Sequence, residues 1–65
     1  MTRHDYEEIA RGLRIYREDI EAEHAGTMLA RHKLDTVDDV VEILVDIFRQ
    51  DNPRFLADRF RQACR

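Results

Sequence analysis

The sequence has very few of the residues that cross-link a chain or bend it. It contains one cysteine, one proline and two glycines, and it has no serine and no tryptophan. The single cysteine excludes an internal disulfide framework, and the scarcity of proline and glycine favours a few helices over a many-turned β fold. No apolar run approaches the length of a membrane span, and the first residues lack the apolar stretch of a signal peptide. We therefore expect a cytoplasmic protein that does not associate with membranes.

The length and composition predict one domain with a thin core. The chain has 65 residues, of which 43% are hydrophobic, and it carries a net charge of -3 with 38% charged residues. Below roughly 70–80 residues a lone core supplies little stability without disulfides, a metal or a partner chain. With disulfides excluded, a metal or oligomerisation remains. The charge balance matches neither a uniformly basic nucleic-acid binder nor an acidic tail.

The first helix is expected over residues 3–25. Thr2 is a suitable N-cap with Asp5 three residues later, and Gly26 is a suitable C′ residue. Gly12 falls inside this helix, which suggests a close helix crossing. The apolar residues repeat at intervals of three and four, which forms a heptad stripe: Tyr6, Ile9, Leu13, Tyr16 and Ile20.

A second helix is expected over residues 36–50. Thr36 and Asp39 resemble a capping box at its start, and apolar residues then cover nearly the whole circumference. Such a helix is either central in the fold or lies between its own domain and a partner. The preceding residues 27–35 fit either a linker or a short helix.

A last helix is expected over residues 53–63. Asn52 is a good N-cap, and Pro53 suits the first helical position. Together these segments predict an all-α bundle of three helices, or four if the segment before residue 36 is helical. The last two helices form a helix-turn-helix-like pair, and we expect homodimerisation to complete the bundle.

Both ends of the chain resemble a family of very short proteins of unknown function from actinobacteriophages and other tailed phages. The opening residues 1–10 resemble its start, T-R-x-D-Y-x-x-I-A. Residues 51–64 resemble its ending, D-N-P-R-F-x-x-x-R-F-x-x-A-C, although Leu56 replaces the usual aspartate after N-P-R-F. The resemblance implies a phage or prophage origin and a common frame, and it implies no activity.

Physical chemistry suggests why these two ends recur together. Tyr6 and Ile9 begin the first apolar stripe, while Phe55 and Phe60 begin the last one. Pairing of the ends would close a small bundle around aromatic side chains. We also expect Arg54 and Arg59 to meet Asp51 or the acidic first turn.

The sequence offers little for catalysis or for a cofactor. There is no serine and no glycine-rich loop, and Cys64 lies on an inward stripe, where cysteine is usually a small buried hydrophobe. Glu21 and His24 have the i,i+3 spacing of di-iron bundle ligands. That spacing arises easily by chance among 14 acidic residues and three histidines. We therefore predict a non-enzymatic protein with no cofactor and no metal site.

Charge is unevenly distributed between the last two helices. Residues 36–51 carry five acidic residues against one arginine, a net of -4, whereas residues 52–65 carry four arginines against one aspartate, a net of +3. A basic helix after a tight turn is what a helix-turn-helix places in the major groove. Pairing with the acidic helix explains the same charges. The candidate nucleic-acid contacts are Arg54, Arg59, Arg61 and Arg65.

The surplus of apolar surface points to a protein interface. The heptad stripe, the broadly apolar second helix and the opposed charges all suit self-association or a partner helix. We therefore expect a homodimeric interaction module that engages a host or phage protein, and the alternative is a DNA-binding or regulatory protein. The expected interface residues are Leu13, Tyr16, Ile20, Val41, Leu44, Val45 and Phe48.

Overall fold

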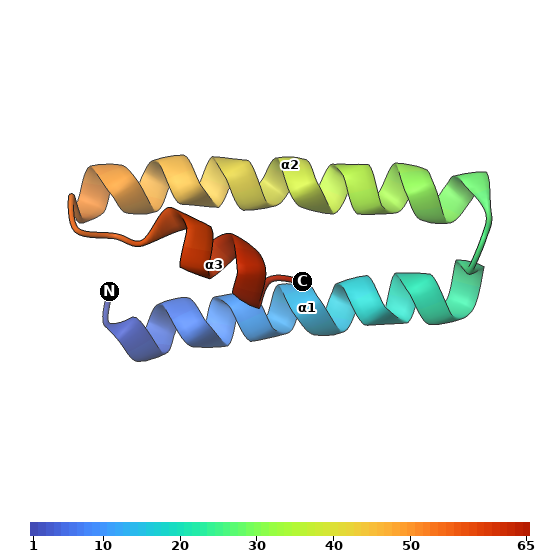
Figure 1. The fold of residues 1–65 in the computed structure, drawn as a ribbon, viewed down its shortest axis with the longest axis horizontal. Helices are drawn as coiled ribbons and strands as arrows, with labels where there is room; N and C mark the ends of the chain where they lie inside the picture. Colours follow the sequence, from blue (N-terminus) through green and yellow to red (C-terminus); the bar gives the residue numbers. More distant parts are fainter.

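The computed structural model of residues 1–65 consists of three helices and no strands (Figure 1). Helix α1 spans Arg3–His24, α2 spans Met28–Asp51 and α3 spans Ala57–Ala63. The two long helices form an antiparallel hairpin, and the short α3 lies against one end of it (Figure 1). The molecule measures 38 × 18 × 14 Å. The predicted all-α bundle is confirmed, and none of its helices is both long and apolar enough to cross a bilayer.

Helix α1 begins and ends at the residues expected from the sequence. The Thr2 hydroxyl accepts a hydrogen bond from the Asp5 amide at 3.3 Å, and the Asp5 carboxylate accepts one from the Thr2 amide at 2.8 Å. The hydrogen bond from the Thr2 amide to the carboxylate lowers the pKa of Asp5. At the other end Gly26 follows the C-cap with a φ of 74°, the left-handed conformation that favours glycine.

Helix α2 begins earlier than the sequence suggested. Thr27 is its N-cap, and its hydroxyl accepts a hydrogen bond from the Ala30 amide at 3.1 Å. Residues 28–35 are therefore the first turns of α2 and not a linker. The capping box predicted at Thr36 is wrong, because Thr36 lies inside the helix and its hydroxyl donates to the carbonyl of His32 at 3.1 Å.

The helix start predicted at Asn52 and Pro53 is also wrong. Asn52 is the C-cap of α2, where its amide donates to the Phe48 carbonyl at 2.8 Å. Its side-chain oxygen accepts from the Arg54 amide at 3.0 Å. That contact makes an Asx turn, which bends the chain instead of starting a helix. Helix α3 begins only at Ala57 and has 7 residues.

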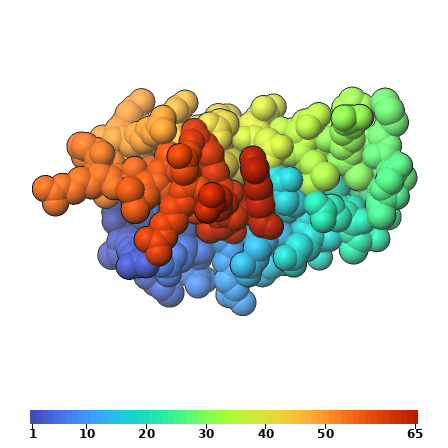
Figure 2. All heavy atoms as spheres, in the orientation of Figure 1, coloured from blue at the N-terminus to red at the C-terminus, as the bar shows by residue number.

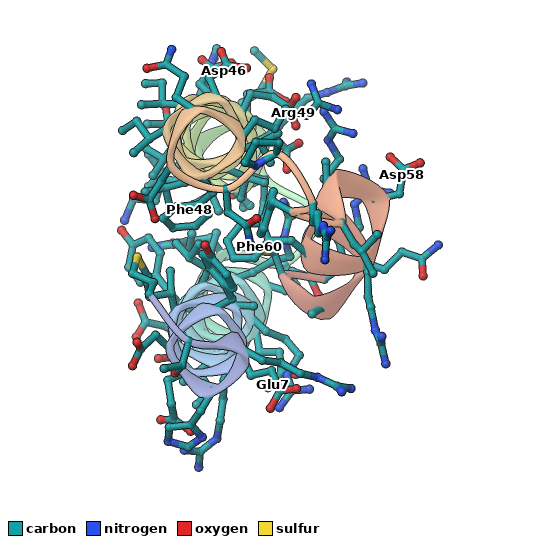
Figure 3. The ribbon with its side chains drawn as sticks, turned by 90° about the vertical axis from the view of Figure 1, so that its left-hand side faces the viewer. Glu7, Asp46, Phe48, Arg49, Asp58 and Phe60 are labelled. Carbon is teal, nitrogen blue, oxygen red and sulfur yellow. The ribbon has the colours of Figure 1, made fainter.

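The two ends of the chain meet in an aromatic cluster. The Tyr6 ring of α1 lies 4.9 Å from Phe48 and 4.8 Å from Phe55, measured between ring centroids. Phe60 of α3 lies 5.3 Å from Phe48 in an edge-to-face arrangement. In Figure 3, Phe48 and Phe60 both point into the space between the helices. The expected pairing of the two ends is therefore confirmed.

The close helix crossing expected at Gly12 is absent. A Cβ added at Gly12 would meet no atom within 4 Å. The core instead depends on ten buried apolar residues, and no polar or charged residue is buried with them. Those residues are Ala10, Ile20, Ala30, Val37, Val41, Val45, Phe48, Ala57, Phe60 and Cys64.

Candidate interaction surfaces

The residues expected at a protein interface are divided between the core and the surface. Leu13 and Leu44 are half-buried, and the Tyr16 side chain is 52% exposed. The other four residues are at most 5% exposed, so they hold the chain's own helices together, and their prediction as interface residues was wrong. These four are Ile20, Val41, Val45 and Phe48.

Their neighbours on α2 form an exposed apolar row. Val40, Ile43 and Ile47 are 40%, 58% and 52% exposed. Their spacing of three and four residues places them on one stripe of the helix. Val40 also lines a hollow of about 370 Å³ with Leu13 and Tyr16 of α1, between the two long helices.

This apolar surface lies on the side of the hairpin opposite to α3. On α1, Tyr16 is nine residues from Glu7, or two and a half turns, and Glu7 lies on the side that faces α3. On α2, Val40 is just over half a turn from Glu42, which contacts α3. Figure 3 shows α3 on one side of the hairpin and no helix on the other. We call this surface the open face: Leu13, Tyr16, Val40, Ile43, Leu44 and Ile47.

A second surface is a groove between α1, the turn after α2 and α3. It has a volume of about 440 Å³. Its apolar lining includes Tyr6, Phe55 and Phe60, and its charged lining consists of three arginines and Glu7. We call it the arginine groove after those three residues, Arg3, Arg54 and Arg59.

The arginines of the groove differ in their contacts. Arg3 donates to Glu7 at 3.1 Å. Arg54 and Arg59 form no ion pair with any acidic residue of the chain. The expected contacts of these two residues with Asp51 or the acidic first turn are therefore absent.

Arg61 is held by acidic residues of the protein. Its guanidinium donates to the two oxygens of Glu42 at 2.8 and 2.7 Å, and to Asp58 at 2.8 Å. The hydrogen bonds from Arg61 lower the pKa of Glu42, and the pKa of Arg61 is raised for the same reason. The acidic and basic helices are thus paired at this point, which was one of the two explanations of their charges.

The four arginines expected to contact nucleic acid do not share one surface. Arg59 and Arg61 are two residues apart on α3, so they point to nearly opposite sides of it. Arg59 lines the arginine groove, whereas Arg61 faces α2. Arg54 also lines the groove, and Arg65 is exposed beyond the end of α3.

Two further polar groups lie between the helices. The Arg17 side chain is only 14% exposed, and it forms an ion pair with Asp38 of α2. Nearby Cys64 is 1% exposed, and burial raises the pKa of its thiol to about 11 although the charge of Arg17 acts in the opposite direction. Local sequence does not distinguish Arg17 from the other arginines, because an arginine beside an apolar stripe is usually solvated. Its role here is to tie α1 to α2.

Glu21 and His24 lie in the last two turns of α1. The acidic side chain that pairs with His24 is Glu23, at 3.8 Å, and not Glu21. Nowhere in the structure do three or more histidine, cysteine, aspartate or glutamate side chains gather as a metal site requires.

Comparison of the chain with known protein families, with curated proteins and with solved structures finds no match.

Proposed function

We propose that this chain is a non-enzymatic phage or prophage protein that acts by binding, and that its open face pairs with the open face of a second copy. The observation that carries the proposal is the exposed row of Val40, Ile43 and Ile47 on the side that α3 leaves uncovered. Apolar residues spaced in this way on neighbouring helices are typical of surfaces that pack against further helices.

The small size of the core supports self-association. Only 10 of the 65 residues are buried, and a domain of this length has little stability to spare. Packing two open faces together would place the four long helices of two chains around one shared apolar interior. A two-fold dimer uses the same patch on both chains, so one open face on each chain is sufficient to form the dimer contact.

The resemblance of the two ends to short phage proteins supports the proposed origin. Tyr6 belongs to the opening motif, and Phe55 and Phe60 belong to the closing one. These three residues are in contact, which supports a common frame built from the two motifs. The residues between the motifs supply the open face, and the dimer is expected to bind a host or phage protein.

Analytical ultracentrifugation tests the dimer directly. We expect the wild-type chain to sediment as a dimer and the Ile43→Glu/Ile47→Glu variant as a monomer, because two buried carboxylates would oppose the contact. Leu56→Glu is the matched control, since Leu56 is 62% exposed but lies on the α3 side. A wild-type protein that remains monomeric at its highest attainable concentration would exclude self-association.

DNA binding is a second candidate function. It is favoured by Arg54, Arg59 and Arg65, which form no ion pair, and it is opposed by the capture of Arg61. If the protein binds DNA, Arg59→Ala should weaken binding at low salt and flatten its salt dependence. Absence of binding to a duplex at low salt would remove this candidate.

A further inference from the structure

We propose that the arginine groove binds an acidic segment of a partner protein, in which carboxylates stand beside a bulky apolar side chain. This surface lies on the opposite side of the hairpin from the open face, so the proposal does not depend on the dimer. It extends the proposed function by assigning the place and the chemistry of partner binding.

The charge of the groove selects an acidic ligand. Three arginines line it against one glutamate. Arg54 and Arg59 are exposed and lack an ion-pair partner, although the chain contains 14 acidic residues. A guanidinium forms two parallel hydrogen bonds with one carboxylate, which gives direction as well as attraction. The groove therefore has two free positions for ligand carboxylates.

The lining of the groove selects an apolar group beside those carboxylates. Phe55 is half-buried and Leu56 is 62% exposed, and both line the groove. The half-buried Tyr6 also lines it. A leucine or aromatic side chain of a ligand would cover this surface, and apolar burial of this kind supplies affinity.

The size and composition of the groove favour a peptide over a nucleic acid. Its volume of about 440 Å³ suits one or two side chains. A duplex backbone would cover Phe55 and Leu56 with no apolar group. The chain that enters this groove is therefore a protein segment.

A selection from random peptides displayed on yeast tests the proposal with the intact protein as bait. We expect the enriched peptides to combine Asp or Glu with Leu, Phe or Trp. A synthetic copy of an enriched peptide should bind about tenfold more weakly, or worse, to Arg54→Ala/Arg59→Ala, because this variant lacks the guanidinium groups that would hold the ligand carboxylates. Leu56→Glu should weaken the same peptide.

Matched controls separate this site from general electrostatics. Arg31→Ala/Arg49→Ala removes two exposed, unpaired arginines elsewhere on the surface, and it should leave peptide affinity unchanged. A peptide whose apolar residues are changed to serine keeps its charge and should lose binding. The Ile43→Glu/Ile47→Glu variant should still bind the peptide, which separates the failure of the dimer from the failure of the groove.

Three results would overturn the proposal. The first is enrichment of no peptide, or of peptides without acidic residues. The second is equal loss of affinity in the Arg54→Ala/Arg59→Ala variant and in the Arg31→Ala/Arg49→Ala control. The third is binding of duplex DNA that depends on Arg54 and Arg59 while no peptide binds, which would assign the groove to nucleic acid.

Discussion

Replacing Gly12 with alanine should stabilise the protein. Gly12 lies inside α1, its φ is not positive, and an added Cβ would meet no atom within 4 Å. Alanine fits such a position without strain, and it restricts the unfolded chain more than glycine does. From the difference in helix propensity, we expect a gain in the free energy of unfolding of about 0.8–1.0 kcal/mol.

The expected gain is large enough to measure as a shift in Tm. The entropy of unfolding is about 2.1 cal/mol/K per residue, which gives about 0.14 kcal/mol/K for a chain of this length. Gly12→Ala should therefore raise Tm by about 6–7 °C. Thermal unfolding followed by far-ultraviolet circular dichroism measures the shift directly.

Gly26→Ala supplies a matched variant with the opposite sign. The space around Gly26 is equally open, but its φ is 74°. A left-handed conformation costs a non-glycine residue about 1–2 kcal/mol, so Tm should fall. An unchanged or lower Tm for Gly12→Ala would refute the reasoning, because it would mean that another helix or chain packs closely on that position.

Two further predictions concern the core. Phe48→Ala should cost about 3–5 kcal/mol, against a total stability of roughly 3–10 kcal/mol for a domain of this size, whereas Leu56→Ala should change little because Leu56 is 62% exposed and lies outside the open face. Urea titrations measure both, and a Phe48→Ala midpoint near that of the wild type would contradict the aromatic core. Burial raises the pKa of the Cys64 thiol to about 11, so the native protein should resist thiol reagents at about pH 8. The unfolded thiol ionises at a lower pH than the folded one. Compared with Cys64→Ala, the wild type should therefore lose about 2–3 kcal/mol of stability between about pH 9 and 11, and a constant difference across that range would contradict the burial argument.

Helix ends were predictable where a local contact decides them. Thr2 and Gly26 work through hydrogen bonds and a backbone angle within a few residues, so their sequence signals were sufficient. The helix start predicted at Asn52 is wrong because an asparagine side chain can cap a helix start or close an Asx turn. The capping box predicted at Thr36 is wrong because the hydroxyl of a threonine inside a helix can donate a hydrogen bond to the carbonyl four residues earlier. Local sequence does not distinguish these alternatives.

The surfaces were only partly predictable, because they depend on how the helices meet. The sequence identified α2 as apolar on nearly all sides, but it did not decide which stripe faces the other two helices. The structure buries Val41 and Val45 and leaves Ile43 and Ile47 exposed. The distribution of free and paired arginines likewise depends on where α3 docks, which no spacing along the chain determines.

Helix α3 covers only one end of the hairpin, and this has a consequence for the way the molecule opens. In Figures 1 and 2 the last segment lies over the half of the hairpin that contains the aromatic cluster. At the other end two helices meet alone, with Ile20 and Ala30 as their buried residues. Local opening costs less where fewer apolar contacts break. Thermal fluctuations should therefore first separate the end of α1 from the start of α2, on either side of Gly26. The contacts of Tyr6 with Phe48 and Phe55 should persist until global unfolding.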